Sequence, residues 1–525
     1  MGLRCGIDLG TTYSAISWYD ASNHRVESVD LETADSARTI RSVVYYPVDA
    51  DEPLVGETAW NAARQFPDRV AYGFKRSMGT GYRMEVDREE YTPPMMSAEV
   101  LKVLVRDAEL YLGEPVEDVI ITVPAYFGDN ERAATEEAGK LAGLNVIGLL
   151  PEPHAAALAF AVSANTAITD RHLLVYDLGG GTLDVALLHS TRDADTGKCL
   201  NLRLRTLCKE GDRELGGLDW DMALADFVAA RIESEHGVNI KGDPAYLPLL
   251  LDNCEQAKRH LTRSKQVAVI GDVANHQVNV TVGDFEDAGR HLLERTRALL
   301  EKVLEEAEEK HGVARQAIEV MLTGGSSRMP MVQTMVEEVT GREPLRHGNP
   351  ELLVSIGASY WAHLLNRGAT VRVTVPADDG GAENREVSVE PAGMTDIGFA
   401  IGVEVYRPDG TGEMRKAVSN VVPAGRPLGE RQEKVFATME DGQTEIEVVV
   451  YEGDSEEPAE CRFLMTFNIT GLPPERPRGS LVKVTLGYDP NGIVRGEAID
   501  QESGQKVDIE VDRSRLRRSV GVGAG

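Results

Sequence analysis

A short motif that occurs twice in the chain limits the folds that are open to it. Residues 6–12 read Gly-Ile-Asp-Leu-Gly-Thr-Thr, and residues 175–182 read Val-Tyr-Asp-Leu-Gly-Gly-Gly-Thr, so Asp8 of the first copy corresponds to Asp177 of the second. Each copy is an apolar strand that ends at an aspartate and is followed by glycine and a hydroxyl residue. Repetition of such a unit predicts two related halves that face each other across a cleft.

Strands and helices alternate up to about residue 365. Residues 119–123 form a β-branched run closed by a proline, which is typical of a buried strand. One helix is predicted to begin at Ser97 and to end before Gly113, and another to run from about Asn130 to Ala142. The alternation predicts an α/β domain with a largely parallel sheet.

From about residue 370 the pattern changes to strands alone. Segments 444–451 and 481–486 have strand character, and the dipeptides at 409–410, 441–442 and 491–492 are typical of tight turns. These features predict a separate antiparallel β domain. The segment 376–381 reads as a loop or linker, and the basic, glycine-rich tail 513–525 is expected to be frayed.

Composition excludes several classes of partner. The chain has 85 Asp and Glu against 55 Lys and Arg, a net charge of −30, which disfavours nucleic acid and anionic membranes as partners. No apolar run reaches the roughly 18 residues of a membrane span, and Asp8 comes too early for a signal-peptide core. The five cysteines are scattered and odd in number, as expected of reduced thiols in the cytoplasm.

The repeated motif has the groups that bind a nucleotide triphosphate with its metal. Glycine lets the backbone approach phosphate closely, and threonine adds hydroxyl donors. Aspartates at strand ends can hold Mg²⁺ through its waters. The residues concerned are Asp8, Gly10, Thr11, Thr12, Asp177, Gly179, Gly180, Gly181, Thr182 and Asp184. Two ordinary hairpins are the alternative. No P-loop pattern occurs in the chain, so any nucleotide fold is of another type.

Two further segments fit a nucleoside. Residues 322–328 form a Gly-Gly-Ser turn between an apolar run and a helix, and this turn could pack against a base or sugar, although such turns are common as plain loops. Glu255, Lys258, Arg259 and Thr262 fall on one face of a predicted helix, which without other partners would simply be solvated.

Taken together, these residues resemble the heat-shock protein 70 (DnaK-type) chaperone family. The matching segments are 7–14, 74–76, 111–116, 121–127, 152–157, 176–184 and 322–330, so the resemblance covers nearly the whole chain. Sugar kinases and actin-like proteins share the general fold but not this set of motifs.

The resemblance implies an actin-like ATPase over residues 1–366, which binds ATP or ADP with Mg²⁺, K⁺ being a further candidate ion. It implies that Lys75 is a catalytic lysine that orients the attacking water, and that Thr182 and Asp184 help to place this water. Glu152 would join Asp8 and Asp177 around the magnesium waters. The nucleotide would further contact Tyr13, Glu255, Lys258, Arg259, Thr262, Gly324, Gly325, Ser326 and Arg328.

A thinner resemblance links residues 393–512 to the β-sandwich that binds peptides in this family. It rests on segments 434–438, 467–473 and 489–493. The candidates for lining a peptide groove are Ile401, Val403, Val405, Ile446 and Val448. Since alternate strand residues must face inward in any sandwich, the same residues are equally candidates for its core.

Besides small substitutions near the nucleotide motifs, the chain has two larger departures from the family pattern. The helical lid is missing, and the segment 367–392, with a possible strand at 371–375 and an acidic loop, replaces the short acidic-leucine linker. A groove without a lid would hold peptide for a shorter time. The replaced linker bears on coupling between the domains and on docking of a J-domain co-chaperone or an exchange factor.

The resemblance therefore implies a slow ATPase of the stress-response chaperone type. ATP hydrolysis in the first domain would modulate the binding of extended apolar or unfolded segments by the second. The alternative is a nucleotide-switched regulator or scaffold that binds one dedicated protein.

Overall fold

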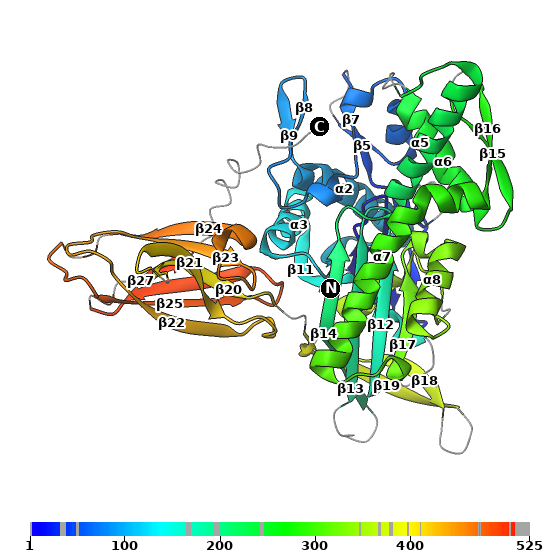
Figure 1. Ribbon diagram of the computed structural model, residues 1–525. Coiled ribbons are helices and arrows are strands. Elements are labelled where there is room, and N and C mark those ends of the chain that lie inside the picture. The colour runs from blue at the N-terminus through cyan, green and yellow to red at the C-terminus, as the bar shows by residue number, and fades with distance from the viewer. Residues whose placement is uncertain are drawn as a thin grey trace. The chain divides into compact units, whose positions relative to one another are not determined.

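The computed structural model describes residues 3–31, 38–48, 52–163, 170–192, 199–241, 246–272, 274–345, 348–365, 369–376, 382–395, 398–409, 411–470, 472, 474–502, 504 and 506–509. The chain divides into two compact units (Figure 1). The first unit comprises Met1–Met78, Tyr82–Tyr126 and Thr135–Met394, and the second comprises Thr395–Gly525 with Gly79–Gly81 and Phe127–Ala134. No helix in the described part of the chain is long and apolar enough to cross a membrane.

Two large sheets form the centre of the first unit. The strands of one are β1 (Leu3–Asp8), β2 (Tyr13–Asp20), β3 (Arg25–Ser28), β4 (Ile40–Arg41), β10 (Val116–Val123) and β11 (Asn145–Pro151). Those of the other are β12 (Arg171–Leu178), β13 (Leu183–Arg192), β14 (Cys199–Asp212), β17 (Ile318–Thr323), β18 (Val371–Pro376) and β19 (Ala382–Thr395). The strand orders are β11-β10-β1-β2-β3, with β4 paired to β2, and β17-β12-β13-β14-β19-β18.

Each sheet is built on a hairpin that carries one copy of the repeated motif. The hairpins are β1–β2 and β12–β13, in which Asp8 pairs with Ala15 and Asp177 pairs with Asp184. Among the strand pairs of these sheets whose register the structure describes, β1–β10, β10–β11 and β12–β17 are parallel and the others are antiparallel. The prediction of a largely parallel sheet is therefore wrong, because short turns return several strands in the antiparallel direction.

The helices of the first unit pack against these sheets, against one another or against the smaller groups of elements described below. They are α1 (Glu57–Ala62), α2 (Pro93–Leu112), α4 (Glu152–Ser163), α5 (Gly217–His236), α6 (Tyr246–Leu261), α7 (Val282–His311), α8 (Pro330–Thr340) and α9 (Leu353–Leu364); α3 (Asp129–Leu141) divides between the two units. Helix α2 begins after Thr92, earlier than predicted, because two prolines at its first positions preset the helical φ. Ser97 does not cap it: this residue is buried inside the helix and its hydroxyl donates to Met78 Sδ.

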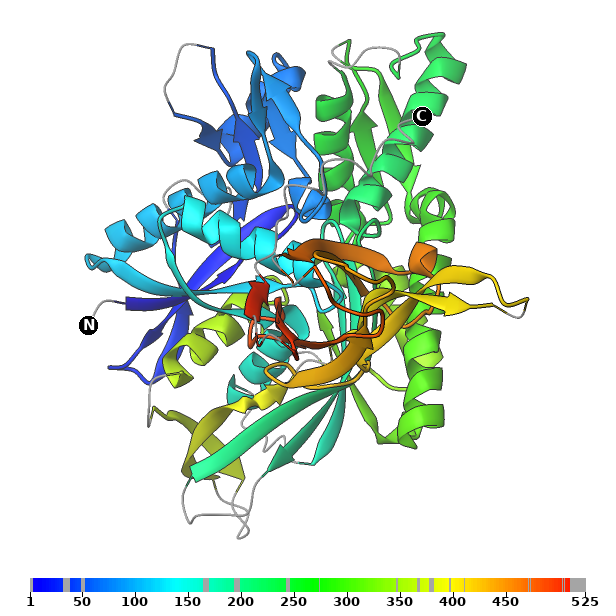
Figure 2. The ribbon, with the colours of Figure 1, turned by 90° about the vertical axis from the view of Figure 1, so that its left-hand side faces the viewer.

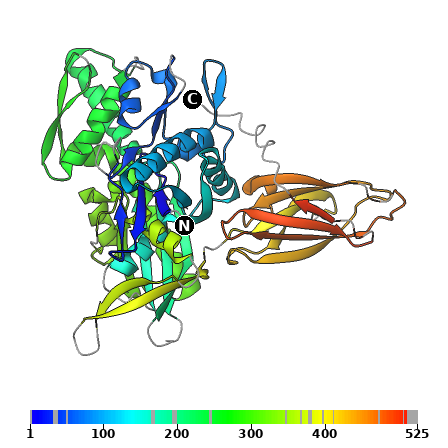
Figure 3. The same cartoon turned by 180° about the vertical axis from the view of Figure 1, so that it is seen from behind.

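Close packing of α4 and α9 fixes the positions of the two motif hairpins. A Cβ on Gly357 of α9 would lie 1.7 Å from the carbonyl oxygen of Ala155 of α4, and a Cβ on Gly6 of β1 would lie 2.1 Å from the backbone nitrogen of Ser359 of α9. The cluster that joins them includes Ile120, Leu173, Val175, Leu158 and Val354. Figure 3 shows the N-terminal sheet of the first unit from behind.

Two smaller groups of elements complete the first unit. One contains α1, β5 (Val43–Tyr45), β6 (Leu54–Val55) and β7 (Val70–Tyr72), and the strands β8 (Met84–Val86) and β9 (Glu89–Tyr91) form a separate hairpin. The other contains α5, α6, β15 (Gln266–Ile270) and β16 (Gln277–Thr281). Figure 2 shows them in blue and green at the upper end of the first unit.

The segment expected to be a linker, 367–392, is for the most part a hairpin of the first unit. Strands β18 and β19 pair antiparallel, from Val371 with Val387 to Pro376 with Ala382, and β19 adds to the edge of the second sheet beside β14. Residues 371–375, which have strand character in the sequence, lie in β18. The expected loop at 377–381 and the tail 513–525 lie outside the described residues.

The second unit holds two antiparallel four-stranded sheets. Their orders are β21-β20-β23-β24 and β22-β25-β26-β27. The strands are β20 (Ile401–Pro408), β21 (Met414–Val422), β22 (Arg431–Ala437), β23 (Ile446–Glu452), β24 (Arg462–Ile469), β25 (Leu481–Tyr488), β26 (Val494–Asp500) and β27 (Lys506–Ile509). Within 398–509 the described residues include no α-helix, only a short 3₁₀ turn at Pro458–Glu460. Gly442 and Gly492 have φ of 71° and 74°, which explains the turn dipeptides there.

Candidate functional site

The structure brings the two motif turns into direct contact. A Cβ on Gly180 would lie 1.9 Å from Thr12 Oγ1, and a Cβ on Gly181 would lie 2.2 Å from Thr11 Cγ2. Any larger residue at these two positions would push the turns apart. The contact explains why the second copy of the motif has glycines opposite the threonines of the first.

Two serines that we did not predict hold the first turn in place. The amide of Gly10 donates to Ser14 Oγ at 3.1 Å, while Ser42 Oγ donates to the Gly10 carbonyl at 2.7 Å. The Ser42 amide also donates to the Thr12 carbonyl at 2.8 Å. Ser14 lies next to the motif, so its hydroxyl was a visible signal, whereas Ser42 comes from a distant segment.

A lysine and four carboxylates meet beside these turns. Lys75 Nζ lies 2.6 Å from Glu152 Oε1, and both side chains are buried. Burial would lower the pKa of Lys75, but the charges of Glu152 and Asp8 raise it above its ordinary value. Burial and then the charge of Glu152 raise the pKa of Asp8 to about 7 and hold the pKa values of Asp177 and Asp184 well above their usual range. An excess of buried negative charge of this kind favours a cation.

Some polar atoms at this site are buried and lack a hydrogen-bond partner among the described residues. They are both carboxylate oxygens of Asp184 and the hydroxyl of Thr12. Buried polar groups are normally satisfied, so these atoms indicate a site shaped for a ligand with donors and acceptors of its own. A hydrated Mg²⁺ and phosphate groups fit this requirement. No three His, Cys, Asp or Glu side chains within the described ranges are grouped to hold a metal directly.

A cavity of 570 Å³ extends from this cluster toward α6 and the turn after β17. Its walls include every predicted site residue of the first unit except Gly181 and Asp184. Residues that sequence reasoning missed also line it, among them Thr39, Leu218, Asp221, His260, Arg263 and Met329. The volume suits a small-molecule ligand.

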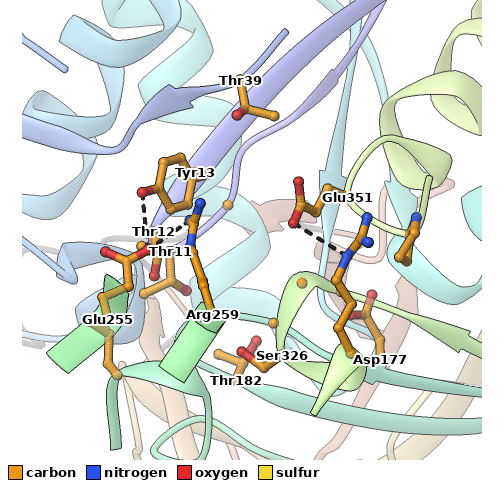
Figure 4. A pocket seen from close by; sticks show the side chains of 18 of the residues that line it. Thr11, Thr12, Tyr13, Thr39, Asp177, Thr182, Glu255, Arg259, Ser326 and Glu351 are labelled. Atoms are coloured by element: carbon orange, nitrogen blue, oxygen red, sulfur yellow. Dashed lines mark hydrogen bonds and ion pairs between the residues drawn. The ribbon is translucent and has the colours of Figure 1, made fainter. Parts of the chain in front are cut away.

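The far end of the cavity is polar and rich in charge pairs. Tyr13 Oη donates to Glu255 Oε1 at 3.1 Å, and Arg259 pairs with the same carboxylate at 2.7 Å. Burial favours the protonated form of Glu255, but the charges of Arg41 and Lys258 hold its pKa below its ordinary value. Figure 4 shows Tyr13, Glu255 and Arg259 on one side of the cavity and Glu351 on the other.

The other predicted nucleoside residues also reach this end. Lys258 Nζ lies 2.8 Å from Asp221 Oδ2 and donates to the Gly217 carbonyl at 3.0 Å. Burial raises the pKa of Asp221 to about 6, although Lys258 opposes this. Thr262 lies one residue beyond the end of α6, where its hydroxyl donates to the Arg259 carbonyl.

The turn after β17 forms the remaining wall. Gly324 has a φ of 80°, and a Cβ there would lie 2.3 Å from the Leu178 carbonyl oxygen, so glycine is required. The short helix Gly325–Arg328 follows, and Arg328 lies 3.6 Å from Glu351 and donates to Asn349 Oδ1 at 2.6 Å. The turn therefore packs directly against the strand that carries Asp177.

A network that no local pattern revealed joins β4 and α1 to α6 beside the cavity. Arg41 of β4 lies 2.8 Å from Glu255 and 3.3 Å from Asp252, both on α6. Trp60 of α1 donates to Asp252 at 3.1 Å. We name Arg41, Trp60, Asp252 and Glu255 the Arg41 clamp. Because it joins α1 and β4 to α6, we expect the clamp to slow the departure of a molecule bound in the cavity.

Replacing Arg41 by Ala is expected to speed the release of a nucleotide from the cavity by about 10–100-fold. The variant removes two charged contacts across the clamp, and a hydrogen bond to a charged group contributes about 1.5–3 kcal/mol, with 1.4 kcal/mol equal to tenfold. Asp252 and Glu255 keep Trp60 and Tyr13 as partners, so no carboxylate is left alone. Stopped-flow release of a fluorescent ADP analogue measures the effect.

The control for the clamp is Arg64→Ala. Arg64 also approaches Asp252, but at 3.5 Å and with 46% of its side chain exposed, so its removal should change the release rate less than about twofold. Equal release from the wild type and the Arg41→Ala protein would show that the clamp does not control this departure.

The candidate groove residues of the second unit lie mostly in its core. Ile401, Val403 and Val448 are buried in one apolar cluster with residues of both sheets. Val405 and Ile446 are half-buried and pack against the same cluster. The structure thus places the first three in the sandwich core rather than on an open groove, because they are the inward members of their strands.

Comparison with known proteins gives a consistent result. A family model described as Hsp70 protein matches residues 4–90 and 80–519. The chaperone protein DnaK of Thermotoga petrophila is 35% identical over 517 residues, which cover 96% of this chain and 80% of that protein. DnaK of Thermosipho africanus is 34% identical over 516 residues (96% and 79%), and DnaK of Halobacterium salinarum is 35% identical over 518 residues (97% and 74%).

Proposed function

Because the chain belongs to the Hsp70 family, and is an ATP-dependent molecular chaperone that hydrolyses ATP to ADP and phosphate, we propose how its two units divide this work. The first unit is an actin-like ATPase whose cavity binds the nucleotide. The second unit binds extended apolar segments of unfolded proteins. One observation carries the assignment of the first unit: both copies of the repeated turn, Lys75 and the buried carboxylates meet at one end of a single cavity.

The phosphates lie at the motif turns in this proposal. Backbone amides of Thr11 and Thr12 and of Gly180–Thr182 donate to phosphate oxygens, together with the hydroxyls of Thr11 and Thr12. The residues that would hold Mg²⁺, through its waters, are Asp8, Asp177 and Glu152. When bound, the ion neutralises charge on the phosphates.

Lys75 is the proposed catalytic residue. Its ammonium orients the attacking water and stabilises the charge that develops on the γ-phosphate, which suits a reaction governed by positioning and electrostatics. Thr182 and Asp184 hold the water on its other side. The carboxyl of Asp184, whose pKa is held well above its usual range by burial and by the charge of Glu152, offers an oxygen acceptor for this water.

The nucleoside lies at the polar end of the cavity. Arg259 and Arg328 offer flat cationic surfaces for the base. Glu255 and Lys258 offer an acceptor and a donor for the sugar, with Thr262 beside them. The turn Gly324–Ser326 closes over the nucleoside because glycine allows its backbone to approach without a Cβ.

Binding of Mg·ATP is expected to release about one proton from Asp8 below pH 7. The pKa of this group is raised from 3.8 to about 7, so its carboxyl is mostly protonated there, whereas a cation and its waters favour the carboxylate. The affinity for Mg·ATP should therefore rise as the pH rises through about 7. The pH dependence of folding has the opposite direction. The stability of the nucleotide-free protein should fall as the pH rises from about 4 to 7, because the folded state binds the Asp8 proton more tightly than the unfolded state does.

Calorimetric titration in two buffers with different ionisation enthalpies measures this proton. The apparent binding enthalpy should differ between the buffers, and the difference should shrink in Asp8→Asn. The same enthalpy in both buffers would contradict a protonated cluster in the free protein.

The second unit is proposed to bind its client by main-chain hydrogen bonds and side-chain pockets. Val405 and Ile446 remain candidates for contact, since both are half-buried, and Tyr406, which follows Val405 on β20, is 49% exposed. The expected partners are a J-domain co-chaperone and a nucleotide-exchange factor. K⁺ is a further candidate ion for the nucleotide site. The expected location of the protein is the cytoplasm.

Steady-state ATP turnover with and without a reduced, unfolded client protein tests the division of work. Turnover that requires Mg²⁺ and rises several-fold with client supports a coupled chaperone. Mg²⁺-dependent turnover that ignores client would keep the ATPase assignment and remove the coupling, as in the scaffold alternative, which the named relatives do not favour.

A further inference from the structure

The turn that carries Lys75 also carries a side chain that the proposed mechanism does not use. The short helix Phe74–Ser77 places Lys75 and Arg76 next to each other, with their side chains in different surroundings. Lys75 is buried among the carboxylates, whereas the Arg76 side chain is 21% exposed and does not line the cavity.

Arg76 joins three segments that are far apart in the sequence. Its Nε donates to the carbonyl of Gly181 at 2.7 Å, and its Nη2 and Nη1 lie 2.5 Å and 3.3 Å from the two carboxylate oxygens of Asp219. A guanidinium can satisfy a carbonyl and a carboxylate at once because its donors lie in one rigid plane. An ammonium has no such fork.

Asp219 is itself fixed against the second motif turn. Its Oδ2 accepts from the Gly216 amide at 2.7 Å at the start of α5. The next two amides of this helix, those of Gly217 and Leu218, donate to the carbonyls of Gly179 and Gly180 at 3.0 and 2.7 Å. The second motif turn is thus held both by the first amides of α5 and by Arg76, which is itself paired with α5 through Asp219.

We propose that Arg76 is a positioning residue that sets the distance between the Lys75 ammonium and the phosphates held by the second motif turn. This inference rests on the proposed catalytic role of Lys75. The turn Phe74–Ser77 belongs to the N-terminal half of the first unit, and Gly181 and Asp219 belong to the other half. The hydrogen bonds of Arg76 therefore link the segment that carries Lys75 to the second motif turn, which binds the phosphates in the proposed function.

The expected signature is a loss of rate with little loss of affinity. Lys75 acts on charge that develops during the reaction, so a misplaced ammonium lowers kcat more than it weakens ATP binding. Arg76→Ala should lower the single-turnover rate of hydrolysis about 10–100-fold and change the Kd for ATP less than threefold. Arg76→Lys, which cannot serve both partners, should recover only part of the rate.

The test combines single-turnover hydrolysis with calorimetric ATP binding for Arg76→Ala, Arg76→Lys and Asp219→Asn. Arg83→Ala is the matched control, because Arg83 forms a surface pair with Glu90 on a different hairpin, and it should leave both quantities unchanged. Adding Arg76→Ala to Lys75→Met should cause no further loss of rate if Arg76 acts through Lys75.

Three results would overturn the proposal. They are an unchanged rate in Arg76→Ala, a weakened ATP affinity at an unchanged rate, and full additivity with Lys75→Met. If Arg76→Ala does not fold, Arg76→Lys and Asp219→Asn decide by the same criteria. Absence of turnover in the wild type would instead contradict the proposed ATPase site, so the two failures are distinguishable.

Discussion

Replacing Lys75 by Met is expected to lower kcat for ATP hydrolysis about 10²–10³-fold while the protein still binds ATP. Met keeps most of the side-chain volume in a position that is only 4% exposed, so packing is largely retained. The positive charge that would stabilise the transferring phosphoryl group is lost. Single-turnover hydrolysis, measured beside calorimetric ATP binding, separates the two effects.

The control for this variant is Lys102→Met. Lys102 lies on the surface of α2 and pairs with Glu99, so its loss should leave turnover within about twofold of the wild type. Without Lys75 the buried carboxylates also lose their nearest cation, so the nucleotide-free variant should bind protons more tightly than the wild type does. Binding of Mg·ATP should therefore release more protons from the variant than from the wild type. Wild-type turnover by Lys75→Met would remove the lysine from the mechanism.

Asp500→Ala is expected to destabilise the second unit by about 3–5 kcal/mol. Arg476 and Asp500 form an ion pair at 2.6 Å in which both side chains are buried. The variant leaves a buried guanidinium whose next carboxylate, Glu502, lies 3.7 Å away and is 54% exposed. Breaking a buried pair costs far more than the pair contributes, because one charge remains without compensation.

Thermal unfolding followed by calorimetry should show the transition of the second unit lowered by at least about 10 °C. The transition of the first unit and the basal ATP turnover should stay unchanged, while stimulation by client is lost. The double variant Arg476→Met/Asp500→Leu removes both charges and should recover most of the stability. A transition unchanged by Asp500→Ala would contradict the importance of this pair.

The parts of the site that follow from local sequence could be predicted. The two copies of the motif place Asp8 and Asp177 at strand ends, and the structure brings both turns into contact with each other. Contacts between distant segments could not be predicted in this way. Arg41 meets Asp252 across 211 positions of sequence, and an arginine in a short strand gives no signal of such a partner.

Local patterns also left two structural questions undecided. Alternation with period two selects Ile401, Val403 and Val448 as one face of their strands, but it does not distinguish a sandwich core from a peptide groove. Residues 371–375 read as a strand, yet no local feature showed that β18 and β19 would join a sheet whose other strands end near residue 323. Both outcomes depend on which surfaces meet after the chain has folded.

The hairpin at the edge of the second sheet has a consequence for synthesis on the ribosome. Strand β14 ends at Asp212, but its outer neighbour β19 begins only at Ala382. At about 5–20 residues per second, the nascent chain therefore carries β14 with an open edge for roughly 10–35 s. An open edge is a template for pairing with other chains, so this chaperone is itself vulnerable to misassembly until almost the whole of its first unit has been translated.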